Sequence, residues 1–527
     1  MLSEFQVLSL WDYIQKNKPL LSIWELTAVL GFDLKDVNAI QQYATVMPVK
    51  KNQKRGVKGY ILAKEQYGET RFDDSIANNS KYPGKLNRTQ LKIKTEVNNK
   101  YGISLVAEKD PGEKIGCNGF DYYSGNFVVR DIKRIKTLVI GDYNTRFGQG
   151  LVLWNGAGYG VLSSSSSRKR NTGISPYYGI NENTFCRGIG IGLKTSYLNI
   201  SVFGSRHKID ALVKDSLGNS VSRIIETGYH RTEYELTNKH SLTHSLYGIN
   251  VDTRFRIVNI GFTAAMHLFD KEFIRDTILS REKYSFVGRK NKNIGMHYFI
   301  NLKNLDFFGE FAIDDSLHPA VLSGFEAMLS GNTGLSVMFR NYDKAYNAFY
   351  SAGLAQGGIT RNERGILVLL ETKPDTMVTV KGYFDYFEHP WVVYGVSSPS
   401  NGYSLSLGTT YDFSYDQSIN VQYKYTQSLH DQSYQESGIV NVQENIKHVG
   451  RIVYRAKVTD KWQFNTQAIA SRFSTENTIG YAIFQELECH IIKETSILFR
   501  YSVFDATYNN KLYLYVTDAT NVFYTAI

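Results

Sequence analysis

The chain has 527 residues, a hydrophobic content of 42% and a mean hydropathy of −0.30. Its longest apolar run, at about residues 365–370, is far shorter than the roughly 20 residues of a membrane-spanning helix, which excludes a helical membrane protein. The net charge of +10 permits a polyanionic partner, whereas the 37 tyrosines and 29 phenylalanines against 9 prolines are typical of a barrel with aromatic girdles, or of a soluble all-β protein such as a propeller.

Residues 1–47 carry a helical pattern and no strand alternation. Ser22 can cap one short helix, and Asp33 can cap the next, which runs through Ile40. The turn between them resembles the second hairpin of a helix-hairpin-helix domain, in which the backbone N–H groups of a tight turn bind a DNA phosphate. Asp33 stands where such turns usually have a second glycine, and only half of the usual tandem is present. The expected phosphate-binding turn consists of Leu30, Gly31 and Phe32.

A polar linker is expected over residues 48–90, with one short strand at 57–63 inside it. The opening residues 1–11 have neither the basic region nor the cleavage pattern of a signal peptide. Either the protein is not exported or the chain begins inside a domain. We expect the second, because the helical module already looks incomplete.

From residue 91 onward the sequence alternates apolar and polar residues, and the hairpin at 247–268 shows this most clearly. Successive side chains of a strand point to opposite faces, so each strand of this hairpin has one apolar and one polar face. Roughly ten such residues let a tilted strand cross a bilayer. The residues expected to face lipid are Ile249, Val251, Val258, Ile260 and Phe262, and those expected to face the lumen are Asn259, Thr263 and His267.

The same alternation recurs in pairs of strands that are joined by short turns and separated by longer polar loops. Short turns at one end and long loops at the other are typical of bacterial outer-membrane barrels, and a propeller has no reason to keep this asymmetry. We therefore predict a mainly β fold: a large antiparallel transmembrane β-barrel of roughly 20 or more strands over residues 91–527, with the small α-helical helix-hairpin-helix module before it. The predicted pairs are 91–96 with 103–108, 120–129 with 135–140, 291–302 with 304–314, 319–330 with 332–343, 362–372 with 375–387, 402–413 with 417–428, 447–458 with 460–472 and 479–490 with 494–506, followed by one strand at 511–517.

A glycine-rich segment at about residues 141–180 interrupts the alternation. It has no GxGxxG motif opening onto a helix and no Walker pattern, which argues against a phosphate cradle. Just downstream, one face of a predicted strand consists of glycines, and such a stripe lets another backbone lie close against it. We expect an internal plug or constricting loop there, with 141–180 as the candidate segment. The stripe consists of Gly188, Gly190 and Gly192.

Three further features are the segment GDYNTRFGQGLVLW at 141–154, the stretch GYHRTE at 228–233 and the helix-hairpin-helix module upstream. Together they resemble a family of large Bacteroidota outer-membrane proteins. The resemblance implies an outer-membrane barrel whose helical module lies in the periplasm, and it implies no particular activity. Members of that family carry a signal peptide, a complete helical tandem and a terminal barrel strand, so we expect this chain to be shortened at both ends.

The sequence contains no GxSxG, no HExxH and no Ser, His and Asp at a recognisable spacing, so we expect no enzyme. The three cysteines have no CxxC spacing, and Asp314 with Asp315 is a solvated turn more readily than a calcium site, so we expect neither cofactor nor metal. His230 can titrate, although nothing nearby in the sequence names a partner. The residues expected to line the lumen or plug, besides the glycine stripe, are Arg254, His267, Lys381, Lys424, Arg451 and Arg455.

Two classes of function remain. In the first, the protein is a non-enzymatic outer-membrane barrel that serves as a channel, a tether or a component of an envelope transport or assembly system, with lipid and other envelope proteins as partners. In the second, the helical module receives DNA that passes a cationic lumen, as in DNA uptake. The sequence favours the first class. A barrel enzyme such as an outer-membrane lipase or protease ranks third.

Overall fold

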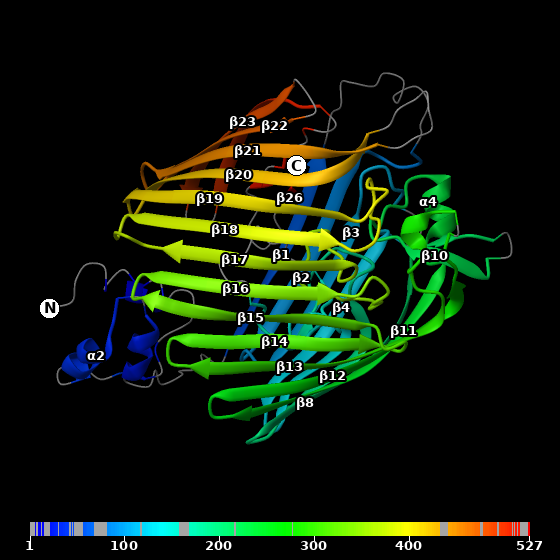
Figure 1. The fold of residues 1–527 in the computed structure, drawn as a ribbon, viewed down its shortest axis with the longest axis horizontal. Helices are drawn as coiled ribbons and strands as arrows, with labels where there is room; N and C mark the ends of the chain where they lie inside the picture. Colours follow the sequence, from blue (N-terminus) through cyan, green and yellow to red (C-terminus); the bar gives the residue numbers. More distant parts are fainter. Residues whose placement is uncertain are drawn as a thin grey trace.

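Antiparallel β-strands dominate the computed structural model (Figure 1). Its described residues are 22–29, 31–41, 56–67, 82–115, 119–156, 168–215, 218–276, 278–432, 441–474, 478–492, 495–507, 510, 512–513, 515–516 and 525–526, with isolated positions among the first 46.

The strands fall into one 24-stranded sheet and one small sheet. The first half of the large sheet contains β1 (Val57–Tyr67), β2 (Asn87–Val97), β3 (Tyr101–Lys109), β4 (Tyr122–Ile132), β5 (Ile135–Arg146), β6 (Gly173–Pro176), β7 (Cys186–Lys194), β8 (Leu198–Ile209), β9 (Ala211–Val213), β10 (Ser220–Ile224), β11 (Leu242–Phe255) and β12 (Val258–Phe273). The second half contains β13 (Gly288–Leu302), β14 (Leu305–Asp314), β15 (Pro319–Ser330), β16 (Thr333–Tyr342), β17 (Glu363–Thr372), β18 (Val378–His389), β19 (Ser400–Ser414), β20 (Gln417–Gln432), β21 (Asn441–Lys457), β22 (Trp462–Phe473), β23 (Ile479–Ile492) and β24 (Thr495–Asp505).

Each long strand pairs antiparallel with the next long strand along the chain. In Figure 1, β12 to β23 form one wall and β1 to β4 lie behind it, so the sheet curls around an interior. The predicted mainly β fold and its strand pairs are therefore confirmed, from β2–β3 through β23–β24. Within the described residues no pairing joins β1 to β24.

Two boundaries differ from the prediction. The strand expected inside the 48–90 linker is β1, and it pairs along its whole length with β2, so the sheet begins at residue 57 rather than at 91. The strand expected at 511–517 is wrong in extent. Its described residues 512–513 are not in a strand, and β25 (Tyr515–Val516) pairs with β26 (Thr525–Ala526) in a sheet of its own.

The hairpin β11–β12 shows how alternation sorts the side chains. Val251 lies opposite Phe262 on the outer face, where Phe262 is 54% exposed. Asn250 lies opposite Thr263 on the inner face, and the two buried side chains form a 3.0 Å hydrogen bond. Arg256 takes a φ of 48° in the tight turn between the strands, as such short hairpin turns require.

The two ends of the barrel differ as predicted. Pairs such as β13–β14 and β15–β16 are joined by short turns, whereas β5–β7, β8–β11 and β16–β17 are joined by long segments at the opposite end. We call these the short-turn end and the long-loop end. This asymmetry places most irregular backbone, and with it most of the unusual chemistry, at one end of the molecule.

Helices are few. At the short-turn end, η1 (Ile23–Ala28) begins where the Ser22 hydroxyl accepts the Trp24 N–H, and it is a 3₁₀-helix rather than the α-helix that the sequence suggests. It packs with α2 (Leu34–Gln41) around buried Leu26 and Val37, and Figure 1 shows this module beside the turns of β13 to β16. The remaining described helices are η2 (Ser280–Glu282) and α4 (Glu233–Asn238), both at the long-loop end. None of the described helices is long and apolar enough to span a membrane.

Candidate functional site

Two loops of the long-loop end fold into the interior of the barrel and bond to each other. They are residues 147–155, which follow β5, and residues 346–355, which connect β16 to β17; we call them the plug loops. The Ala352 N–H donates to the Gly150 carbonyl at 2.9 Å, which joins the two loops directly. The two segments therefore form one unit, although about 200 residues of chain separate them.

A buried carboxylate ties the first plug loop to the barrel wall. Glu310 on β14 is 2% exposed, and its oxygens accept the backbone N–H groups of Gln149 at 2.6 Å, Leu151 at 3.1 Å and Val152 at 3.2 Å. Gly148 takes a φ of 57°, and a Cβ there would lie 2.6 Å from the Glu310 carboxylate. Gly148, the first glycine of FGQG, is therefore needed both for the turn and for the close approach of the Glu310 carboxylate.

Apolar side chains complete the attachment. Phe147 stacks on Phe203 of β8 with ring centroids 5.7 Å apart, and the Tyr346 hydroxyl donates to the Leu151 carbonyl at 2.9 Å. The surrounding cluster draws on both walls and both plug loops, so the interior is packed at this level. Its fully buried members include Val139, Tyr143, Phe147, Leu151, Val152, Leu153, Phe308, Ala312, Ala320, Leu322, Tyr342 and Tyr346.

The glycine stripe of β7 lies under side chains of the glycine-rich segment. A Cβ at Gly190 would lie 3.0 Å from Ile174 and 3.3 Å from the ring of Tyr143. Gly188 and Gly192 continue the stripe beside β8. The predicted close approach is thus made by two side chains, and the plug loops themselves contact other strands.

Three strands share a buried ion-pair cluster that holds the backbone directly after the second plug loop. Arg340 of β16 contacts Glu363 of β17 at 2.5 Å and Asp385 of β18 at 2.7 Å, and all three are at most 1% exposed. Glu363 also accepts the backbone N–H groups of Gln356 at 2.9 Å and Gly357 at 3.3 Å. Removing one member would leave an uncompensated buried charge, which costs about 3–5 kcal/mol.

His267, expected to face the lumen, is buried against the second plug loop. It is 0% exposed, its Nδ1 lies 2.9 Å from His244 Nε2, and its ring packs against Phe349 and Tyr350. A solute could reach it only after the plug loops moved.

The other predicted lumen residues are spread along several strands. Lys381 pairs with Glu371 at 3.2 Å, and Arg451 donates to Gln467 at 2.7 Å. These cations are neutralised or hydrogen-bonded within the wall, so they do not gather into one binding site. Of the remaining three, Lys424 is half-buried, Arg455 is exposed and the side chain of Arg254 lies outside the described part.

The turn that resembles a phosphate-binding hairpin is occupied by its own side chains. Gly31 takes a φ of 88°, Phe32 is 7% exposed in the small helical core, and Leu30 lies outside the described residues. The Asp33 carboxylate accepts the Asp36 N–H at 2.8 Å, while the Asp33 N–H donates to the Asp36 carboxylate at 3.2 Å. These two carboxylates cap α2 and place negative charge where a phosphate would sit.

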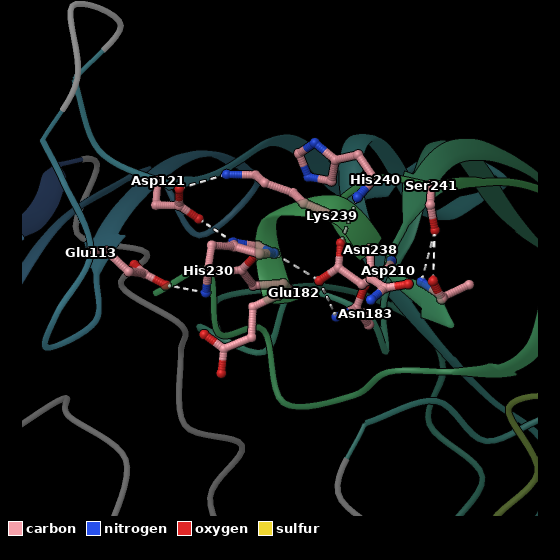
Figure 2. Close-up of polar contacts among 12 residues, drawn as sticks. Glu113, Asp121, Glu182, Asn183, Asp210, His230, Asn238, Lys239, His240 and Ser241 are labelled. Atoms are coloured by element: carbon pink, nitrogen blue, oxygen red, sulfur yellow. Dashed lines mark hydrogen bonds and ion pairs between the residues drawn. The ribbon is translucent and has the colours of Figure 1, made fainter. Parts of the chain in front are cut away.

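A second polar cluster joins the loops at the long-loop end, as Figure 2 shows. The His230 ring is hydrogen-bonded through Nδ1 to Asp121 and through Nε2 to Asp210, the latter at 2.9 Å. The His230 N–H donates to Glu113 at 2.9 Å, and Lys239 contacts Asp121 at 2.5 Å. This His230 cluster ties the β3–β4 loop to the long excursion between β8 and β11.

The charges in the His230 cluster follow from its geometry. Burial alone would lower the pKa of His230, but hydrogen bonds to Asp121 and Asp210 and their charges raise it to about 10. Burial would raise the pKa of both carboxyls, yet their hydrogen bonds to His230 keep each pKa below its ordinary value. Burial raises the pKa of the neighbouring Glu182 to about 9, so this carboxyl is neutral near pH 7.

The same residues lie close enough to be considered as metal ligands. Glu113 and Asp121 with His230, or Glu182 and Asp210 with His230, have ligand atoms within 4.8 Å of one another. A metal would need a free lone pair on a ring nitrogen of His230. Both ring nitrogens are hydrogen-bonded to carboxylates, and the pKa of His230 is raised to about 10, so neither nitrogen offers a lone pair near pH 7. The arrangement is therefore that of an ion-pair cluster.

The sequence analysis singled out His230 but not its partners. Asp121 is 109 residues away and Asp210 is 20 residues away, so no local spacing connects them. Glu310 and Arg340 were also missed. A charged residue at an alternate strand position looks like ordinary lumen solvation.

Comparisons with solved structures find β-barrel folds of the same kind. No family model matches the sequence, and no curated protein sequence matches it. Among solved structures, the chain is similar to the siderophore receptor PirA of Pseudomonas aeruginosa (9% identity, TM-score 0.39, 80% of this chain and 66% of that one). It is also similar to Wzi of Escherichia coli, described as a carbohydrate-binding β-barrel of capsule assembly (13%, TM-score 0.36, 84% and 90%), and to OprD of P. aeruginosa (10%, TM-score 0.36, 70% and 88%). The chain spans just under two thirds of the PirA chain. The assignment of a function rests on this chain's own residues.

Proposed function

We propose that this protein is a non-enzymatic outer-membrane β-barrel whose interior is closed at rest by its own plug loops. It would serve as a gated channel or a receptor in solute transport. The single observation that supports the outer-membrane assignment is a continuous apolar row across the outer face of β11 to β15.

This row follows directly from the strand register. Val251 lies opposite Phe262, Phe262 opposite Met296, Met296 opposite Phe311, and Phe311 opposite Val321. Facing residues of paired strands lie on the same side of the sheet, so these five side chains form a belt over β11 to β15. Phe262, Met296 and Phe311 are 54%, 41% and 47% exposed. A soluble protein has no reason to expose such a continuous belt, whereas lipid would cover it.

The asymmetric ends support an orientation. Short turns face the periplasm in bacterial barrels and long loops face outward. The helical module beside the turns of β13 to β16 would then be periplasmic, and the plug loops would enter the barrel from the outer side.

The test compares two variants of the β11–β12 hairpin, each with one added positive charge at a different depth in the membrane. Phe262→Arg puts a guanidinium near the middle of the belt, and Phe255→Arg puts it beside the Arg256 turn. An arginine facing lipid costs about 2–4 kcal/mol at the midplane and about 0–1 kcal/mol near the interface. Refolding into phosphatidylcholine vesicles should therefore be impaired for Phe262→Arg and normal for Phe255→Arg. Equal refolding of both variants would contradict the membrane assignment.

DNA uptake by the helical module stays a prediction, and the mutual capping of Asp33 and Asp36 does not favour it. Duplex DNA binding by the full chain that weakens with salt and is lost in Gly31→Pro would support it.

A further inference from the structure

We infer that a cationic, aromatic-lined pocket at the long-loop end binds a small organic anion that carries two or more negative charges, such as a sugar phosphate or a polycarboxylate. This inference deepens the proposed function, since it names the class of solute that a receptor or gated channel would take. The pocket lies apart from the plug contacts of Glu310 and from the His230 cluster.

Three loops build the pocket. Residues 281–284 come from the β12–β13 connection, 344–361 from the β16–β17 connection and 391–394 from the β18–β19 connection. They enclose a cavity of about 470 Å³, which is within the range of small-molecule sites. Because each loop starts from a different pair of strands, the pocket has rigid support on three sides.

The lining holds more positive than negative charge. Its cations are Arg223, Arg281, Lys344 and Arg361, and its two carboxylates are Glu282 and Glu363. Glu363 is already paired with Arg340 at 2.5 Å, and Glu282 lies 3.5 Å from Arg281 and accepts the Ser285 hydroxyl. Both negative charges are therefore engaged, and the surplus charge of the cavity is positive.

Arg361 and Lys344 are the most informative cations. Arg361 donates to neutral oxygens only, to Ser285 at 3.3 Å and to Asn347 at 3.1 Å. Within the described residues, no carboxylate lies within ion-pair distance of either Arg361 or Lys344. Burial lowers the pKa of Arg361, and the charge of the nearby Glu282 offsets this effect only in part. Such a group is stabilised by an incoming carboxylate or phosphate.

Aromatic rings hold the lysines in place. Lys344 Nζ lies 4.9 Å from the ring centre of Tyr284, and Lys283 Nζ lies 4.9 Å from that of Trp391. The two rings meet edge to face at 5.2 Å. One aromatic pair thus keeps two like charges beside each other, Lys344 in the lining and the exposed Lys283 just outside it, an arrangement that favours a ligand with at least two negative charges.

The wall behind the rings is fixed by hydrogen bonds. The Trp391 N–H donates to the Asn362 side chain at 2.8 Å, and the Asn362 amide donates back to the Trp391 carbonyl at 2.9 Å. The Trp391 indole N–H donates to the Ser280 carbonyl at 2.9 Å. Trp391 therefore has no freedom to collapse into the cavity, and the pocket is preorganised.

Isothermal titration calorimetry of the full chain in neutral detergent tests the inference, with glucose 6-phosphate, citrate, inorganic phosphate and glucose as probes. We expect glucose 6-phosphate and citrate to bind, with weaker binding at higher salt, and glucose not to bind. Arg361→Gln and Lys344→Gln should each raise the Kd about tenfold or more, because each removes a charge-assisted contact. Since Arg361 is partly buried, Lys344→Gln keeps the test valid if Arg361→Gln folds poorly.

Arg134→Gln and Lys461→Gln, in exposed turns at the short-turn end, are the matched controls and should leave the Kd unchanged. Any of three results would overturn the inference: neither organic anion binds, glucose binds equally well, or the pocket variants leave the Kd unchanged. Phosphate binding as tight as that of glucose 6-phosphate would overturn its organic part. Binding in detergent needs neither membrane nor conductance, so a failure here is distinct from a failure of the proposed function.

Discussion

At the scale of single residues, the His230 cluster shows how a buried charge organises loops. His230 is 2% exposed and bridges Asp121 and Asp210, which come from different loops. With the ring charged, His230 is a cation between two anions, and Lys239 is a second cation beside Asp121. Loss of the ring would leave two carboxylates buried without their common partner, and such a loss costs about 3–5 kcal/mol.

The pH dependence of stability tests this account. The pKa of His230 is raised from 6.5 to about 10, so its stabilisation is complete below pH 6.5 and is lost as the pH rises through 10. We expect His230→Gln to lower the unfolding temperature in detergent at pH 6 and to lose less stability than wild type between pH 6.5 and 10. The exposed His430→Gln should behave as wild type. Identical pH profiles for wild type and His230→Gln would contradict a charged His230.

At the scale of elements, the strands and a plug segment within 141–180 were predictable, whereas the contacts that attach the plug were not. Period-two alternation fixes which residues share a face, so pairs such as β13–β14 and β17–β18 fall within a few residues of the prediction. The glycine stripe at Gly188 to Gly192 indicated a close approach, but not that Glu310 would hold the loop. Nor could spacing connect Glu113 to His230, which lie 117 residues apart. Contacts of that kind depend on how the sheet curls.

The attachment of the first plug loop gives an element-scale prediction. Glu310→Gln replaces the anion that accepts the N–H groups of Gln149, Leu151 and Val152. Hydrogen bonds to a charged group are worth about 1.5–3 kcal/mol, so hydrogen exchange of these amides should accelerate at least tenfold. Glu371→Gln, on β17 of the same wall and near the short-turn end, should leave their exchange unchanged. Equal exchange in both variants would show that packing alone holds the loop.

At the scale of the whole molecule, an apolar row covers the outer face of β11 to β15, and loops of the chain pack the interior behind it. Loops of the long-loop end line the pocket of Arg361 and Lys344, and the His267 ring packs against Phe349 and Tyr350 of the second plug loop. Movement of 147–155 would break the bonds to Glu310 before it exposed the interior.

The central claim is that the protein is a membrane barrel closed by its plug loops. Single-channel recording in planar lipid bilayers tests this claim most directly. Wild type should insert and remain mostly closed, and a variant in which residues 148–154 are replaced by a short glycine-serine linker should show large, steady conductance. Glu310→Gln should fall between the two, with more frequent openings than Glu371→Gln. A steady, large conductance in wild type, or no conductance in the variant without the loop, would contradict the account.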